Sequence, residues 1–252
     1  MIKDFLKNFT TAVVATMLYV TPVQADNICV AANFDGNVTR AKQVIKTCED
    51  NGGDTILLMG DYSVRGIPGK RNFRTDFDST SKVLNEFGRS ELPICVLSGS
   101  NDKISDIRQV ASGNQNMTVL EDNKPVKVGD LNVIPLNGYN DQRFMFEGAK
   151  FVDGNDLRQY LATLSQNPNA TAVSHISPYG HIDKIRSGIN VGDRNLENTL
   201  DSLNMSSISA AIRESPGARV INKRRWKINP GESFLMLETN GKGNIKGARF
   251  YK

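Results

Sequence analysis

Residues 54–61, Asp-Thr-Ile-Leu-Leu-Met-Gly-Asp, are the strongest indication of the fold class, because an apolar run of strand length ends abruptly at a glycine and an aspartate. Such a continuous run is typical of a strand that is buried on both faces, as in a parallel sheet. Two similar runs flank it in the sequence, at 28–32 and 93–97, and polar residues follow each of them. The stretch therefore predicts one strand of an α/β protein.

Helical segments separate these predicted strands. Residues 38–49 carry apolar side chains at helical spacing, and residues 79–87 form a second predicted helix. Strands that alternate with helices across short polar loops indicate parallel βαβ units. In sheets of this kind the functional side chains lie at the carboxyl ends of the strands. The polar residues at 33–37, 60–61 and 99–102 occupy these positions.

The second half of the chain continues with shorter elements. A turn at 127–130 precedes a strand at 132–136. The remaining predicted elements are a helix at 155–164, a strand at 171–174 that ends at His175, a helix at 195–203 and a terminal hairpin of 234–238 and 245–251. This order predicts two packed mixed sheets flanked by helices, in one domain that spans residues 26–252.

The first 25 residues have the features of a signal peptide. Lys3 and Lys7 precede an apolar run at 9–20, and Val23-Gln24-Ala25 provides small residues for cleavage. We therefore expect an exported protein, periplasmic or secreted, with no membrane span in the mature chain. An uncleaved N-terminal anchor is the alternative.

The mature chain contains three cysteines, Cys29, Cys48 and Cys95. An odd number in an exported chain cannot form a complete set of disulfides. Cys29 and Cys95 lie in apolar strand-like runs, where we expect buried thiols. A bridge between Cys29 and Cys48 is left open.

The order of the polar clusters resembles that of the calcineurin-like metallophosphoesterases, whose motifs are D-x-H, G-D, G-N-H-D, a lone H, and G-H-x-H. The matching segments are Ala-Asn-Phe-Asp-Gly-Asn at 32–37, Gly-Asp at 60–61 with Arg-Gly at 65–66, Gly-Ser-Asn-Asp at 99–102, Ser-His-Ile-Ser-Pro-Tyr-Gly at 174–180, Gly-Ile-Asn-Val-Gly-Asp-Arg at 188–194 and Ile-Asn-Pro-Gly at 228–231. The resemblance covers nearly the whole mature chain. It implies a four-layer α/β/β/α sandwich of two mixed sheets flanked by helices.

The resemblance also implies positions for two divalent metal ions, which in such sites lie about 3.5 to 4 Å apart and activate a water. One ion would be bound at the positions of Asn33, Asp35, Asp61 and Arg213. The other would be bound at the positions of Asp61, Ser100, His175 and Ala211. Ala211 and Arg213 stand where the family has the two histidines of G-H-x-H. The chain has two histidines, His175 and His181, whereas the family pattern calls for five.

The surviving groups make a poor metal site. Asp61, His175 and Asp35 could still bind a cation, and Asn33 offers a weak carbonyl ligand. The guanidinium of Arg213 stays protonated and repels a cation. Asn101 replaces the proton-donating histidine of G-N-H-D and cannot deliver a proton at neutral pH. We hypothesise that Arg213 fills the space of a metal and neutralises Asp35 and Asp61.

These substitutions predict a noncatalytic binding scaffold, a pseudoenzyme without a cofactor. The first alternative is a residual phosphate-ester hydrolase with a divalent metal (Mn, Fe or Zn) at Asp61, His175 and Asp35, in which Asn101 and His175 are vestigial catalytic groups. Ligands recruited from outside the motifs, such as Asp193 or Glu214, remain open. Asp102 is expected to cap a helix that starts near Lys103, and Asn37 to cap the helix that follows it.

Two basic segments lie outside the motifs, at 65–74 and at 222–227, and the second surrounds the only tryptophan, Trp226. Cations interleaved with an aromatic ring can bind phosphate-containing or acidic ligands. The second alternative is therefore a polyanion binder, although such segments are usually solvated loops. The net charge of +4 is a mild excess that does not by itself imply nucleic acid.

Overall fold

The computed structural model describes residues 26–64, 76–180, 182–221 and 225–251. Within these residues, twelve strands form two six-stranded sheets. The first sheet has the order β12 (Ile245–Tyr251), β11 (Phe234–Thr239), β1 (Asn27–Ala31), β2 (Thr55–Leu58), β3 (Ile94–Val96) and β4 (Met117–Val119). The second has the order β5 (Val126–Val128), β6 (Leu131–Leu136), β7 (Thr171–Ser174), β8 (Ser207–Ser209), β10 (Arg225–Asn229) and β9 (Gly217–Ile221).

Both sheets are mixed, as predicted. β1 to β4 run parallel, and β11 and β12 are antiparallel additions at one side. In the second sheet β6, β7, β8 and β10 run parallel between the antiparallel edge strands β5 and β9. The terminal hairpin of the sequence is the pair β11 and β12.

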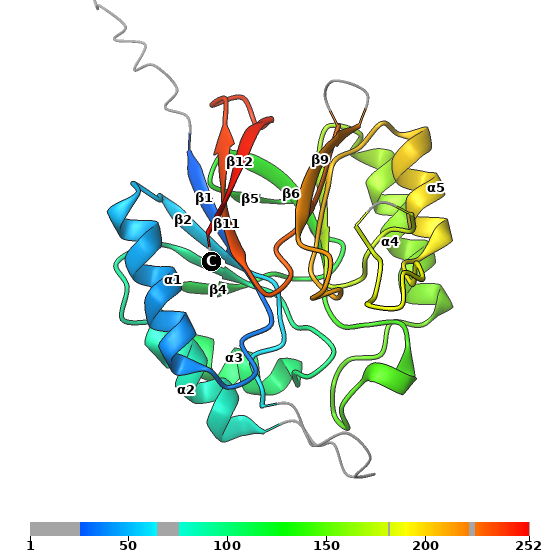
Figure 1. Cartoon of the computed structure of the whole chain (residues 1–252). Helices are drawn as coiled ribbons and strands as arrows, with labels where there is room; N and C mark the ends of the chain where they lie inside the picture. The colour runs from blue at the N-terminus through cyan, green and yellow to red at the C-terminus, as the bar shows by residue number, and fades with distance from the viewer. Residues whose placement is uncertain (1–25, 65–75, 181, 222–224, 252) are drawn as a thin grey trace, which may run out of the picture.

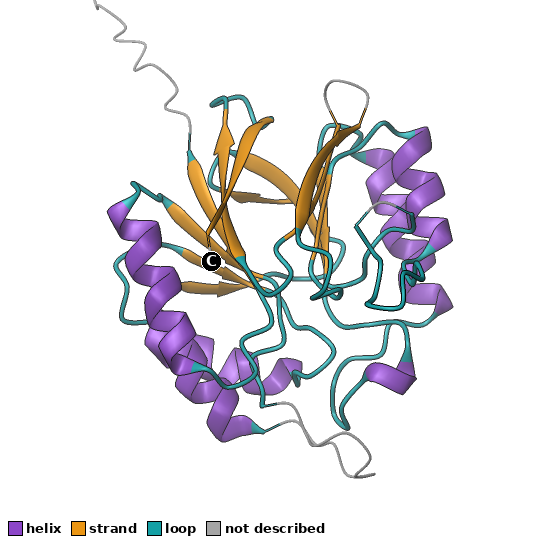
Figure 2. Cartoon of the chain, viewed as in Figure 1, coloured by secondary structure: helices purple, strands orange, loops and turns teal. Residues whose placement is uncertain are grey.

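Helices cover the outer faces of the two sheets, as Figures 1 and 2 show. The first sheet is covered by α1 (Val38–Asp50), α2 (Phe77–Phe87) and α3 (Ile104–Ser112), and the second by α4 (Gly154–Gln166) and α5 (Arg194–Ser202). A short 3-10 helix, η1 (Gln142–Phe144), lies in the loop after β6. The predicted four-layer architecture is confirmed.

Three buried apolar clusters fill the three interfaces between the layers. In β1, Cys29 and Ala31 face the helices, whereas Ile28 and Val30 face the second sheet. This alternation follows from the two-residue period of a strand. Because both faces are covered, the strand needs apolar residues at every position, which is why its sequence reads as a continuous apolar run.

Polar side chains cap the helices where the sequence changes from loop to helix. Asn37 accepts the backbone N–H of Arg40 at 2.9 Å, so its predicted role as the N-cap of α1 is confirmed. Asp76 caps α2 and Asp153 caps α4 in the same way. The N-cap of α3 is Lys103, which makes no side-chain capping bond, so the predicted capping role of Asp102 is wrong.

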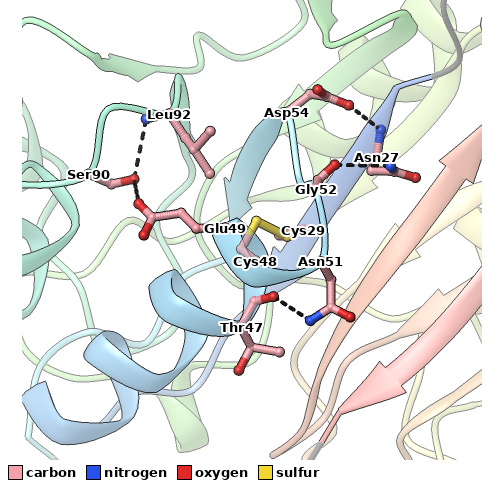
Figure 3. Close-up of a disulfide and its surroundings, with 10 residues drawn as sticks. All are labelled: Asn27, Cys29, Thr47, Cys48, Glu49, Asn51, Gly52, Asp54, Ser90 and Leu92. Carbon is pink, nitrogen blue, oxygen red and sulfur yellow. Dashed lines mark hydrogen bonds between the residues drawn. A yellow bond between two sulfur atoms is a disulfide. The ribbon is translucent and has the colours of Figure 1, made fainter.

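A disulfide joins Cys29 of β1 to Cys48 near the end of α1, with the two Cα atoms 6.1 Å apart (Figure 3). The expectation of a buried free thiol at Cys29 is therefore wrong. A strand and the helix packed on it bring the two sulfur atoms together, and sequence spacing alone does not reveal this contact. Cys95 remains free on β3, and burial raises the pKa of its thiol to about 11.

The predicted signal peptide at 1–25 lies outside the described residues. None of the helices within the described ranges has the length and apolar composition of a membrane span.

Candidate functional site

The loops at the carboxyl ends of four parallel strands meet at one place in the molecule. Asp35 follows β1, Asp61 follows β2, Ser100 follows β3 and His175 follows β7 directly. The backbone holds the first two loops together, because the N–H of Asn33 donates to Gly60 at 3.0 Å and that of Asp35 donates to Asp61 at 3.0 Å. Sequence reasoning placed these side chains at the ends of strands, and the fold brings them together from the two sheets.

Three residues of this group have left-handed backbone conformations, with φ of 60° at Asn33, 50° at Asp35 and 60° at Asp61. Asn and Asp tolerate this region better than other non-glycine residues, at a cost of roughly 1 kcal/mol each. A glycine is required at position 99, because an added Cβ there would lie 2.5 Å from Asp61 Oδ1 and 2.9 Å from His175 Cε1. The loops are therefore built for close approach around Asp61.

Asp61 is the centre of the hydrogen-bond network. The hydroxyl of Ser100 donates to its Oδ1 at 3.1 Å, and the backbone N–H of Asn101 donates to the same atom at 3.0 Å. His175 Nε2 lies 3.5 Å away. Burial alone would raise the pKa of this carboxyl, but the charges of His175 and Arg213 lower it well below its ordinary value. Asp61 is therefore a buried carboxylate with several donors.

Arg213 lies in the loop after β8 and reaches two carboxylates. Its guanidinium binds both oxygens of Asp35, with Nη2 2.7 Å from Oδ1, and Nη2 also lies 3.4 Å from Asp61 Oδ2. The Arg213 side chain is 5% exposed and that of Asp61 is 3% exposed, whereas that of Asp35 is 28% exposed. The bidentate pair with Asp35 is the stronger contact, since its geometry matches the planar guanidinium.

His175 is buried between a carbonyl and a carboxylate. Its Nδ1 is 2.8 Å from the carbonyl oxygen of Met59, so Nδ1 carries the proton and Nε2 faces Asp61. Burial lowers the pKa of the imidazole, but the Asp61 carboxylate and the Met59 carbonyl raise it above its ordinary value. The ring of Tyr139 makes an edge contact, with the two ring centres 5.8 Å apart.

Asp102 is fully buried and binds backbone amides of two loops. Its carboxylate accepts the N–H groups of Gly99 at 2.8 Å, Asp61 at 2.6 Å and Tyr62 at 2.8 Å. Burial and the nearby charge of Asp61 raise its pKa to about 6. Asp102 therefore fixes the loop that carries Asp61 against the loop after β3, which is a positioning role that helix-capping rules did not suggest.

Two buried amides keep an unused polar atom. Asn33 donates from Nδ2 to the carbonyls of Ala210 and Gly231, at 3.0 and 2.8 Å, which leaves its Oδ1 without a partner. The Nδ2 of Asn101 is also buried without a partner. The oxygen of Asn33 is the one atom of that side chain that could ligate a cation. The Oδ1 of Asn101 accepts the hydroxyl of Ser100 at 3.1 Å, and its unused Nδ2 can only donate a hydrogen bond.

Arg40 of α1 is a site residue that sequence reasoning missed. Its guanidinium donates to the carbonyls of Ala32 at 2.7 Å, Asn33 at 2.5 Å and Ser233 at 3.1 Å, and it lies over the ring of Phe34. Burial and the charge of Arg213 lower its pKa to about 10. Nothing in the local sequence distinguishes this arginine from a solvated one.

Asn229 holds the loop that carries Arg213. It is fully buried, and its amide donates to Ile212 at 2.6 Å and to Ser215 at 3.1 Å, one residue before and two residues after Arg213. Asn229 of the Asn-Pro-Gly turn at 229–231 therefore fixes the backbone on both sides of Arg213. Ala211 has no donor side chain, and its backbone N–H donates to the carbonyl of His175.

The donor set does not suit two divalent ions. The guanidinium of Arg213 contacts Asp35 and Asp61, the two carboxylates that an ion would need. In the part of the chain that the structure describes, no three His, Cys, Asp or Glu side chains gather as a metal-binding group. Asp193 instead caps α5, and Glu214 is exposed, so neither is placed as a substitute ligand. His181 lies outside the described residues.

The basic segments differ from the surface loops that the sequence suggested. Arg225 and Lys227 lie on β10 and are buried, and they pair with Glu197 and Asp201 of α5. They are therefore structural, and the expectation that they present charge to a ligand is wrong. The other basic residues of this segment, at 223 and 224, and those at 65–74 lie outside the described residues.

Two mixed sheets between helices, with polar loops at the ends of the parallel strands, define the calcineurin-like metallophosphoesterase fold, and the chain has this fold. The protein TT1561 of Thermus thermophilus superposes with a TM-score of 0.67 at 14% identity, over 91% of this chain and 99% of that one. A dimetal phosphatase from Danio rerio superposes with a TM-score of 0.53 at 11% identity, over 91% of this chain and 98% of that one. No family description and no curated protein matches the sequence.

Proposed function

We propose that this chain is a noncatalytic member of the metallophosphoesterase fold class, a pseudoenzyme that serves as a binding scaffold. The observation that carries the proposal is the contact of Arg213 with Asp35 and Asp61. A guanidinium keeps its proton at any physiological pH, so it supplies permanently the positive charge that metal ions supply in a two-metal phosphatase. The negative charges of Asp35 and Asp61 are therefore neutralised without a metal ion from solution.

The position of the family's proton donor supports the same proposal. Asn101 cannot transfer a proton to a leaving group. Its side chain is buried, as are those of Asn33, Asp61, His175 and Arg213. The former catalytic residues therefore form a closed network inside the protein, and a ligand that approaches from solvent would first meet Asp35.

Export is part of the proposal. Disulfides persist in oxidising compartments and are rare in the cytosol. The bridge between Cys29 and Cys48 therefore supports the role of residues 1–25 as a signal peptide, with the mature protein in the periplasm or secreted. Mass spectrometry of the protein recovered from the exported fraction should find an N-terminus near Asp26 and the bridge intact.

The test is elemental analysis of the mature protein, purified without a chelator after growth with manganese, iron and zinc available. We expect well below one equivalent of metal per chain, because Arg213 repels a cation at the position that both carboxylates face. An assay with an aromatic phosphodiester and an aromatic phosphomonoester should give no hydrolysis above that of an Asp61→Ala control.

The outcome against the proposal is a metal content near one equivalent that is lost in Asp61→Ala. That result would favour the residual hydrolase, in which Asp61, His175 and Asp35 hold a divalent ion with the unused oxygen of Asn33. The phosphodiester assay of the metal-loaded protein would then distinguish an enzyme from a metal-binding scaffold.

A further inference from the structure

Two of the three helices that cover the first sheet, α1 and α2, leave a groove between them. Two adjoining cavities, of about 450 and 180 Å³, share Lys42 of α1 and Glu86 of α2 as lining residues, together with Arg89 from the turn after α2. The helices α1 and α2 lie side by side in Figure 1. Neither cavity is lined by a residue of the Asp61 network, so the groove is a separate surface.

The floor of the groove is apolar. Val38 and Ile45 of α1 line the groove, and both side chains pack against the apolar core between the helices and the first sheet. They are partly exposed, because α2 does not cover them completely. A ligand with an apolar side chain could cover this remaining apolar surface and remove it from water, which favours binding.

The walls of the groove carry more positive than negative charge. The cations are Lys42, Lys46, Lys82 and Arg89, and the acids are Glu49 and Glu86. Both acids already have partners, since Glu86 pairs with Arg89 at 2.7 Å and Glu49 accepts the hydroxyl of Ser90 at 2.8 Å.

Of the cations, Lys46 pairs with Asp50 at 2.7 Å. Across the described residues, Lys42 and Lys82 have no carboxylate within 4.0 Å, and both are exposed. One of these lysines stands on each helix. The groove therefore offers one uncompensated positive charge on each side of an apolar floor.

The shape of the groove favours an elongated ligand. Its lining on α1 extends from Val38 to Glu49, which corresponds to about 16 Å at 1.5 Å per residue. A peptide of about five residues in extended form has the same length. We propose that the groove binds an acidic peptide segment of a partner protein, whose apolar side chains rest on Val38 and Ile45 and whose carboxylates pair with Lys42 and Lys82.

The experiment is fluorescence anisotropy with the labelled synthetic peptide Glu-Leu-Glu-Leu-Glu, whose two leucines share one face of an extended chain, and the mature, disulfide-bonded protein. We expect saturable binding that weakens as salt is raised, since exposed charges are screened. The double variant Lys42→Glu and Lys82→Glu should bind about tenfold or more weakly, because two attractive pairs become repulsive. The uncharged peptide Gln-Leu-Gln-Leu-Gln should not bind.

The matched control is the double variant Lys124→Glu and Lys242→Glu, which changes the net charge equally at two exposed lysines outside the groove. It should bind the acidic peptide within about twofold of the unmodified protein, because distant surface charges are screened at physiological salt. Thermal melts should show that both double variants are folded. Absence of saturable binding, or equal weakening by the two double variants, would overturn the proposal.

Discussion

Among the single residues, Arg213 lies where a metal ligand is expected and binds the carboxylates that a metal would bind. The sequence suggested this contact because Arg213 stands at a histidine position of the family pattern, while Asp61 matches an aspartate of the pattern and Asp35 takes the place of another histidine. The rest of the network depends on residues that local sequence does not mark. Arg40 and Asn229 look ordinary in the sequence, and only the fold directs them at the site loops.

Replacing Arg213 by alanine should lower the free energy of unfolding by about 3 to 5 kcal/mol, because Asp35 would lose its bidentate partner and the buried Asp61 would lose one of its two compensating charges. Urea unfolding followed by circular dichroism measures the change. The triple variant Arg213→Leu, Asp35→Asn and Asp61→Asn removes all three charges and should recover much of the loss. A loss below about 1 kcal/mol for Arg213→Ala would show that the pair is not structural.

The coupling of His175 to Asp61 predicts a pH dependence of stability. The raised pKa of His175 means that its contribution is fully present below its unfolded value, about 6.5, and is lost as pH rises through the folded pKa. The lowered pKa of Asp61 means that its contribution is present above about 3.9 and is lost as pH falls through the folded pKa. The interaction of His175 with Asp61 should therefore contribute most to the free energy of unfolding of the protein between about pH 4 and 6.5.

Nuclear magnetic resonance of the imidazole protons tests this coupling. Asp61→Asn should lower the pKa of His175, since burial then acts without the neighbouring negative charge. An unchanged pKa in Asp61→Asn would mean that the carboxylate does not hold the proton on His175.

Among the secondary-structure elements, strands buried on both faces were predictable and strands with charged faces were not. β1, β2 and β3 read as apolar runs, because helices cover one face and the second sheet covers the other. β10 alternates basic and apolar residues, which sequence reasoning took for a basic loop. Its Arg225 and Lys227 are buried because α5 places Glu197 and Asp201 against them, a contact between distant segments.

The disulfide stabilises the contact between β1 and α1, and it encloses the loop that carries Asn33 and Asp35. Replacing Cys29 and Cys48 by alanine should lower the free energy of unfolding by about 3 kcal/mol, as expected for a bridge between residues 19 apart in sequence. Urea unfolding with and without a reductant measures this. The reductant should destabilise a Cys95→Ala variant and leave the Cys29→Ala/Cys48→Ala variant unaffected; any other pattern contradicts the assignment.

In the molecule as a whole, the site is assembled from both sheets. Asp35 and Asp61 follow strands of the first sheet, whereas His175 and Arg213 follow strands of the second. The packing of the two sheets through their shared apolar cluster therefore sets the distance between the carboxylates and the guanidinium. The chain retains the fold of a dimetal phosphatase, and we propose that the donor atoms of its site have changed.

This retention predicts that a metal site can be rebuilt. The triple variant Asn33→Asp, Ala211→His and Arg213→His restores three ligand positions of the family pattern. We expect it to bind Mn²⁺ or Zn²⁺ with measurable heat in calorimetry, under conditions in which the unmodified chain does not. Adding Asp61→Ala should abolish the binding. Equal binding by the unmodified chain would contradict the replacement of the metal by Arg213.

Local sequence patterns were enough to predict the order of strands and helices and the polar clusters at the strand ends, and the residue types show that the chain has two histidines. Each of these follows from short segments, since apolar periodicity and residue type are local properties. The disulfide, the buried charges of β10, and the roles of Asp102, Arg40 and Asn229 became visible in the folded chain alone. These depend on which distant segments face each other, and a buried polar group must find its partner wherever the packed chain supplies one.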